Sequence, residues 1–204
     1  QDVNTLNMIT CHLGNGASIT AIKNGKCVNT SMGLTPLGGI MMGTRSGDID
    51  PTVVFYMMKK LECTPDEMDT FLNKRSGMLG VSGISSDARD IQQAVDAGNE
   101  RAKLTVDLYT NRVINVVGGY YMQLGHVDAI AFTAGLGEND AQMRERILKD
   151  LEEGMGLSID YELNKTIHGK ECLISKPDSK IKVYVVPTNE ELVIARDTCR
   201  LLGL

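Results

Sequence analysis

The chain has little of what metal-binding, disulfide-bonded and nucleic-acid-binding proteins need. Its five cysteines are scattered without a C-x-x-C pair, and its three histidines are dispersed, so their spacing forms no zinc constellation. An odd number of scattered cysteines fits a reducing compartment. The net charge of −5 makes a nucleic-acid partner unfavourable, because the nucleic-acid backbone requires a basic surface. We therefore expect small molecules as partners and no nucleic acid.

Long apolar segments are also missing. No uninterrupted apolar run reaches the roughly 18 residues that a membrane span needs, and no signal-peptide pattern opens the sequence. We expect no membrane partner and a cytoplasmic location. The 204 residues, 42% of them hydrophobic and 23% charged, suit a globular chain with a sizeable core. Because the sequence begins with Gln1 rather than methionine, we expect a fragment of a longer protein.

The first part of the chain predicts a three-stranded meander. Turn signals fall at Gly14-Asn15-Gly16 and at Asn24-Gly25, whose residues tolerate positive φ. The segments around these turns are apolar or alternate in the way that strands do. The strands are expected over residues 6–13, 17–23 and 26–30.

The meander leads into a glycine-rich loop around Thr44-Arg45-Ser46. Glycines at this density let backbone N–H groups approach a ligand, because no Cβ stands in the way. Arg45 offers a planar, permanently charged fork for phosphoryl oxygens, and the hydroxyls of Thr44 and Ser46 can donate beside it. The pattern predicts a phosphate site, with a flexible loop and a solvated arginine as the alternative.

The remainder of the chain predicts helices interrupted by two strands and two loops. Helices are expected over residues 52–61, 64–73, 85–95, 99–124, 140–153 and from 188 onward, and strands over 127–134 and 182–186. Residues 76–83 and 155–177 are expected as loops without chemistry, with His168 on the surface. This order predicts an α/β fold, a mixed sheet with helices on both faces.

The helix over residues 99–124 has apolar residues on more than one stripe. We expect it to be buried on two sides, either centrally or against a second subunit. Gly118-Gly119 predicts a bend or a close-packing point within it.

The segment 135–139 follows the strand 127–134 and precedes a helix. Strand, glycine turn and helix can present backbone amides and a helix dipole to a nucleotide. The pattern lacks the third glycine of the dinucleotide fingerprint, so an NAD-dependent oxidoreductase is weakly supported and a plain tight turn stays open. Glu190 and Glu191 open the last helix, where they either complement its dipole or meet a metal-bound phosphate.

Taken together, several motifs resemble the acetate kinase family closely and in order, over nearly all of the chain: CHLGNGAS, MGLTPLGGIMMGTRSGDIDP, SSDARD, FTAGLGEN and PTNEELVIARDT. The resemblance implies an actin/Hsp70-like ATPase fold of the ribonuclease H-like class, in which the nucleotide lies between two lobes. It implies reversible transfer of a phosphoryl group from ATP to acetate, giving ADP and acetyl phosphate. Propionate or butyrate kinase, and a non-catalytic nucleotide-binding module of the same superfold, are the alternatives.

The resemblance also implies roles for individual residues. Arg45 resembles the arginine that stabilises the transferring phosphoryl group, and Pro36 resembles a wall of the acetate pocket. Glu190 resembles the magnesium-associated glutamate. The phosphate-contacting hairpin, with a histidine close to catalysis, corresponds to His12, Asn15 and Gly16. The segments that hold the adenosine end correspond to Asp87, Ala88, Arg89, Gly135, Leu136, Gly137, Glu138 and Asn139.

Residues 1–204 correspond to the C-terminal, nucleotide-binding and dimerising lobe of such an enzyme. The resemblance implies an N-terminal lobe that supplies a further magnesium contact, an aspartate, another arginine, a second histidine and most of the acetate pocket. Without that lobe this chain is expected to be a poor kinase or none. The expected cofactor is Mg²⁺, and the expected partners are acetate or acetyl phosphate, ATP or ADP, and a second copy of this lobe.

Overall fold

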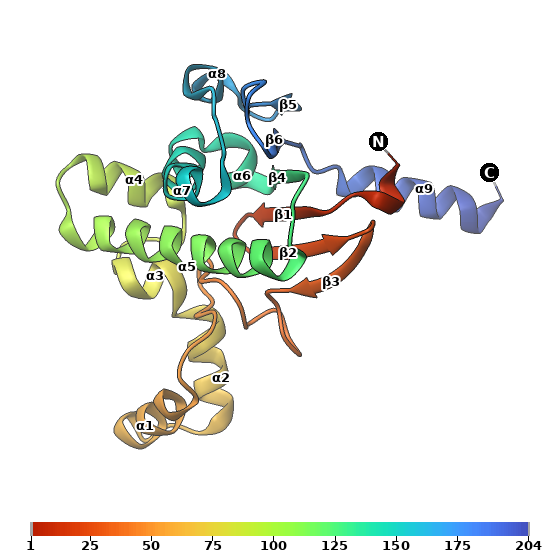
Figure 1. Ribbon diagram of the computed structural model, residues 1–204. Coiled ribbons are helices and arrows are strands. Elements are labelled where there is room, and N and C mark those ends of the chain that lie inside the picture. Colours follow the sequence, from red (N-terminus) through yellow and green to blue (C-terminus); the bar gives the residue numbers. More distant parts are fainter. Residues whose placement is uncertain (1, 204) are drawn as a thin grey trace.

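The first three strands form the antiparallel meander that the turn signals predict. The computed structural model describes residues 2–203 (Figure 1). A single 3₁₀ turn, η1 (Val3–Thr5), precedes β1 (Met8–Leu13), β2 (Ala17–Lys23) and β3 (Lys26–Thr30). β1 pairs with β2 and β2 with β3, both antiparallel, so the predicted meander is confirmed.

Three further strands complete a mixed sheet: β4 (Ala129–Thr133), β5 (Cys172–Leu173) and β6 (Lys182–Val185). The strand order across the sheet is β3-β2-β1-β4-β6-β5. β4 runs parallel to both β1 and β6, so the carboxyl ends of these three strands meet at one edge. In an open α/β sheet, that edge is where a ligand is expected.

The two faces of the sheet differ in burial. One face is fully enclosed, with α5 (Glu100–Leu124) packed against β2 and β1 and α7 (Ala141–Met155) beside α5. Its side chains include Ile9, Cys11, Leu13, Ile19, Ile130, Phe132, Val183 and Val185, all 0% exposed. Met8, Thr10 and His12 point to the other face and are only half-buried. His12 therefore reaches the ligand edge from the more open face.

Several helices begin at the capping residues that the sequence contains. α1 (Pro51–Leu61) is capped by Asp50, and α2 (Pro65–Lys74) by a Thr64–Glu67 capping box. α4 (Ala88–Asp96) and α9 (Glu190–Leu202) also form where helices were predicted. α9 extends away from the sheet (Figure 1). Within residues 2–203, no helix combines the length and the apolar character that crossing a bilayer requires.

Three short helices occupy segments that were predicted as turns or loops: α3 (Gly77–Ser82), α6 (Ala134–Asn139) and α8 (Tyr161–Thr166). Those predictions were wrong. α3 and α6 each begin at a residue with positive φ, Gly77 at +61° and Ala134 at +63°. Such starts leave no conventional capping signal in the sequence, because neither Ser76 nor Thr133 makes a side-chain capping bond.

The predicted close packing at Gly118 and Gly119 is absent, since a Cβ at either position would meet no described atom within 4 Å.

A buried arginine joins α6, α7 and α8. Arg144 of α7 is 0% exposed and donates hydrogen bonds to the carbonyl oxygens of Gly137 (3.0 Å), Asn164 (3.0 Å) and Ile167 (2.9 Å). Its Nε donates to the side-chain oxygen of Asn164 at 2.8 Å, and Asn164 in turn donates to the Ala141 carbonyl at 2.9 Å. These bonds fix α8 over the start of α7.

We predict that Asn164→Ala destabilises the chain by about 1–3 kcal/mol, because it leaves buried polar groups of Arg144 and Ala141 without partners. Urea denaturation followed by circular dichroism measures this difference. Asn115→Ala is the matched control, since Asn115 is an exposed amide that bonds only its helical neighbour Asn111. Equal free energies of unfolding for the two variants would contradict the prediction.

Candidate functional site

A cavity of about 870 Å³ lies where the carboxyl ends of β1 and β4 meet. The turn after β1, the glycine loop, the start of α4 and the segment from α6 into α7 all contribute to its wall. The predicted nucleotide residues that line it are Asn15, Asp87, Ala88, Arg89, Gly135, Leu136 and Asn139. The fold thus brings together segments that are more than a hundred residues apart in the sequence.

Four predicted nucleotide residues do not line the cavity: His12, Gly16, Gly137 and Glu138. His12 lies one residue before the end of β1 and pairs with Thr133, on the half-buried face of the sheet. Gly137 is buried, and a Cβ there would lie 3.2 Å from the backbone of Phe132. Its carbonyl accepts from Arg144, so Gly137 serves the packing of α6.

Glu138 holds α6 to the segment before α9. Its Oε1 accepts hydrogen bonds from the Ala134 amide (2.8 Å), the Thr188 amide (2.8 Å) and the Thr188 hydroxyl (2.6 Å). Burial alone would raise the pKa of Glu138, but these hydrogen bonds and nearby His12 together lower it. The carboxylate therefore stays ionised, and its Oε1 is occupied by donors from within the protein.

The glycine loop lies against the hairpin turn at one end of the cavity. The Gly43 amide donates to the Asn15 carbonyl at 3.2 Å, and a Cβ at Gly43 would overlap the Asn15 side chain. A Cβ at Gly16 would lie 3.4 Å from Nη1 of Arg45, so the guanidinium is next to the hairpin. Among the described residues Arg45 forms no ion pair. Its charge is therefore available to an anion at this end.

The two hydroxyls beside Arg45 are used within the protein. Thr44 Oγ1 donates to the Asn73 carbonyl at 2.9 Å, and Ser46 Oγ donates to the Gly47 carbonyl at 2.9 Å. They were predicted to donate to phosphate, and the structure does not support that role, because each hydroxyl has only one proton.

At the other end of the cavity, two helices begin at capping carboxylates. Asp87 Oδ1 accepts from the Arg89 amide at 2.9 Å, and Asp140 Oδ1 accepts from the Met143 amide at 2.8 Å. The Arg89 guanidinium also bonds the Asp87 carboxylate, with Nη2 2.6 Å from Oδ2, and lowers the pKa of Asp87 to about 2. Both helix dipoles thus already face a negative charge.

The remaining predicted residues are not part of the cavity. Pro36 is exposed in the glycine loop and does not line it. Glu190 begins α9, and its side chain lies outside the part of the chain that the structure describes. The described residues contain no group of three or more His, Cys, Asp or Glu side chains arranged to share a metal ion.

Sequence analysis missed several cavity residues, among them Met78, Lys165 and His168. His168 is exposed, as predicted, but it also lines the cavity. Lys165 and His168 both belong to a segment in which apolar residues do not recur with the period of a helix or a strand, and which has no glycine motif. The only local signal is Asp160, which caps α8.

Comparison with known proteins identifies the family. The model of the acetokinase family matches residues 1–196. This chain belongs to the acetokinase family. An acetate kinase of Finegoldia magna is 58% identical over 196 residues, which are 96% of this chain and 49% of that protein. The chain spans about half the length of the curated relatives that it matches.

Solved structures of acetokinases give the same fold. The crystal structure of Porphyromonas gingivalis acetate kinase is 48% identical with a TM-score of 0.94, over 98% of this chain and 50% of that one. A propionate kinase of Francisella tularensis is 41% identical with a TM-score of 0.87, over 95% of this chain and 49% of that one. The mixed sheet is therefore that of the actin/Hsp70-like ATPase fold, as predicted.

We predict that the stability contributed by Glu138 depends on pH. Because folding lowers the pKa of Glu138 from its ordinary 4.5, its contribution is complete above about pH 4.5 and is lost as the pH falls through the folded-state pKa. The difference in free energy of unfolding between wild type and Glu138→Gln, from urea titrations at pH 3 to 7, should shrink on the acid side. A difference that does not change with pH would show that charge plays no part.

Proposed function

We propose that this chain is the C-terminal, nucleotide-binding half of an acetate kinase, which transfers a phosphoryl group reversibly between ATP and acetate. The observation that carries the proposal is the cavity, where Asn15, the start of α4 and the α6 segment converge beside Arg45. The acetokinase family match and the acetate kinase relatives support the same assignment.

In the proposed reaction the acetate itself is the nucleophile, so the protein has mainly to position the substrates and to supply positive charge. A carboxylate oxygen of acetate attacks the γ-phosphorus of ATP, the bond from that phosphorus to the β,γ-bridging oxygen breaks, and ADP leaves. Charge develops on the equatorial oxygens of the transferring group. Arg45, held beside Gly16 and without an ion pair among the described residues, is placed to stabilise that charge. His12, one residue before the end of β1, is proposed to supply a further polar group at this end.

Magnesium is expected to arrive with the nucleotide. In such sites Mg²⁺ is bound by one or two carboxylates together with substrate phosphates, and it neutralises charge on the β- and γ-oxygens. Glu190 is the carboxylate that would hold it. The hydrogen bonds from Thr188 to Glu138 place the start of α9 next to α6, which fits this role.

We also propose that the protein is a cytoplasmic homodimer formed through this half. α5 carries apolar side chains on the side away from the sheet, with Leu104 51%, Leu108 41% and Met122 76% exposed. Such side chains suit a contact with a second subunit. All five cysteines are free, as expected in a reducing compartment.

Propionate kinase is the second candidate, because a propionate kinase structure superimposes at a TM-score of 0.87. The two reactions share the nucleotide and phosphoryl chemistry and differ in the length of the acid. Initial rates of the complete enzyme with acetate and propionate distinguish them.

Titration calorimetry of this chain with Mg-ADP tests the nucleotide site. We expect a dissociation constant of roughly 0.1 to 1 mM, typical of half a cleft, and no binding of NADH, the comparison ligand. Binding of NADH with no binding of ADP would overturn the proposal in favour of a dinucleotide-dependent oxidoreductase.

We predict that Arg45→Ala in the complete enzyme lowers kcat by about 10³-fold or more and changes nucleotide affinity little, because the charge it stabilises develops in the transition state. Steady-state kinetics of acetyl phosphate formation measure both quantities. Arg75→Ala is the control, since Arg75 is an exposed arginine at the end of α2. Turnover equal to that of the control would remove Arg45 from the catalytic role.

A further inference from the structure

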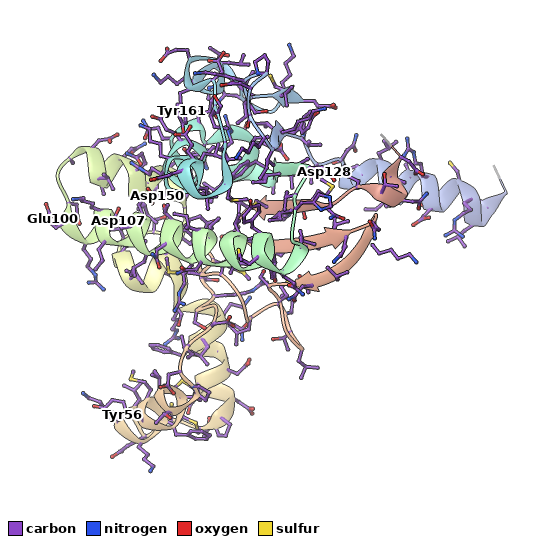
Figure 2. The ribbon with its side chains drawn as sticks, viewed as in Figure 1. Tyr56, Glu100, Asp107, Asp128, Asp150 and Tyr161 are labelled. Atoms are coloured by element: carbon purple, nitrogen blue, oxygen red, sulfur yellow. The ribbon has the colours of Figure 1, made fainter. Side chains whose placement is uncertain are left out.

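A further wall of the cavity comes from the segment between α7 and β6. Lys165 is on α8 and His168 follows it, and both line the same cavity as the starts of α4 and α7. Figure 2 shows Tyr161, the first residue of α8, above the part of the molecule where α6 and α7 lie. This wall rests on different residues from those that the glycine motifs predict.

The wall is held in a fixed position relative to α6. Arg144 donates to the carbonyls of Gly137 in α6 and of Ile167 beside His168. The Gly169 amide donates to the Glu138 carbonyl at 3.2 Å, which adds a second tie. His168 is therefore presented by a segment that buried hydrogen bonds anchor on both sides.

The end of the cavity next to this wall suits a nucleoside better than a phosphate. The helix starts there are already capped by the carboxylates of Asp87 and Asp140, and the Arg89 guanidinium is paired with Asp87, so neither the helix dipoles nor Arg89 is free for a phosphate. Leu136, Ala88 and Ala141 give the same end apolar surface for a flat ring. Phosphates are favoured instead at the glycine end, next to Arg45.

The hydrogen bond of His168 fixes what its ring can offer. Nδ1 lies 2.9 Å from the Asn139 carbonyl oxygen. A carbonyl only accepts, so Nδ1 carries the proton and, in the neutral ring, Nε2 is left as an acceptor. The amino group of adenine and the hydroxyls of ribose are donors that such an acceptor can bind, whereas O6 of guanine is not.

Lys165 is partly occupied by a neighbouring carboxylate. Its ammonium donates one hydrogen bond to Glu162 Oε1 at 2.7 Å in an exposed ion pair, so its hydrocarbon stem and its other N–H groups are open to a ligand. We propose that His168, flanked by Lys165, recognises the nucleoside of the bound nucleotide by accepting a hydrogen bond at Nε2. This inference rests on the proposed nucleotide-binding function and adds a specificity residue to it.

Histidine NMR of the wild-type chain tests the inference directly, because the chain has only three histidines. Ring signals of ¹³C-labelled histidine, assigned with His168→Gln and His126→Gln, are followed during titration with Mg-ADP, Mg-GDP and Mg-pyrophosphate. We expect Mg-ADP to shift His168, and pyrophosphate to shift His12 without shifting His168. His126 is the internal control. Its ring is 3.9 Å from Asp128, at the end of β1 away from the cavity (Figure 2).

The outcomes separate the inference from the proposed function. If Mg-ADP shifts His12 but not His168, nucleotide binding stands and the inference is overturned. A His168 shift with pyrophosphate alone also overturns it, because the contact is then not with the nucleoside. If no histidine moves and calorimetry finds no ADP binding, the proposed function fails and the inference fails with it. Equal shifts with ADP and GDP support the inference and favour a ribose hydroxyl, which both nucleotides share, whereas a shift with ADP only assigns the donor to the adenine amino group.

Affinity gives a second measurement. His168→Ala should weaken Mg-ADP binding about 2- to 10-fold, the range for one neutral hydrogen bond, and leave pyrophosphate affinity unchanged. His126→Ala, which removes an exposed ring far from the cavity, should change neither. An ADP affinity of His168→Ala equal to that of wild type would overturn the inference.

Discussion

One buried guanidinium holds one side of the cavity in place. Arg144 has no carboxylate within its hydrogen-bonding set, and it is tolerated because carbonyl and amide oxygens satisfy it. Desolvation lowers its pKa, and nearby Asp140 opposes that shift. The carbonyls it uses belong to the final turns of α6 and α8, where helical carbonyls lack partners of their own. Helices of six residues are unstable alone. Arg144 therefore stabilises both and, with them, one side of the cavity.

The cavity has two electrostatic ends, and the fold builds them by different means. At one end glycines let backbone and Arg45 approach the hairpin closely. At the other end carboxylate caps cancel the helix dipoles, and apolar and amide groups remain. A ligand with a charged tail and a flat, weakly polar head matches this division, as the proposed nucleotide does.

Local signals in the sequence predict those parts of the structure that local chemistry determines. Asp50, Thr64 and Asn99 cap helices where the sequence suggested, and the turns at residues 14–16 and 24–25 set the meander. α3 and α6 could not be found this way, since they start at positive φ and depend on tertiary partners such as Glu138. The motifs placed Asn15 and residues 87–89 correctly at the cavity. Lys165 and His168 reach it only because Arg144, more than twenty residues away from His168, anchors their segment.

Along β1 the side chains alternate between the two faces of the sheet, so Cys11 and His12, which are neighbours in the sequence, lie on opposite faces. Cys11 points into the enclosed face, where burial raises the pKa of its thiol to about 12, while His12 points to the half-open face. The nucleophilic thiolate form is therefore almost absent at Cys11 and the sulfur is out of reach of solvent. As a result, oxidants and alkylating reagents that attack cysteine have no direct route to the strand that supports the phosphate end. Such reagents would react first with the more accessible thiols, those of the exposed Cys27 and Cys199 and of the half-buried Cys63 and Cys172.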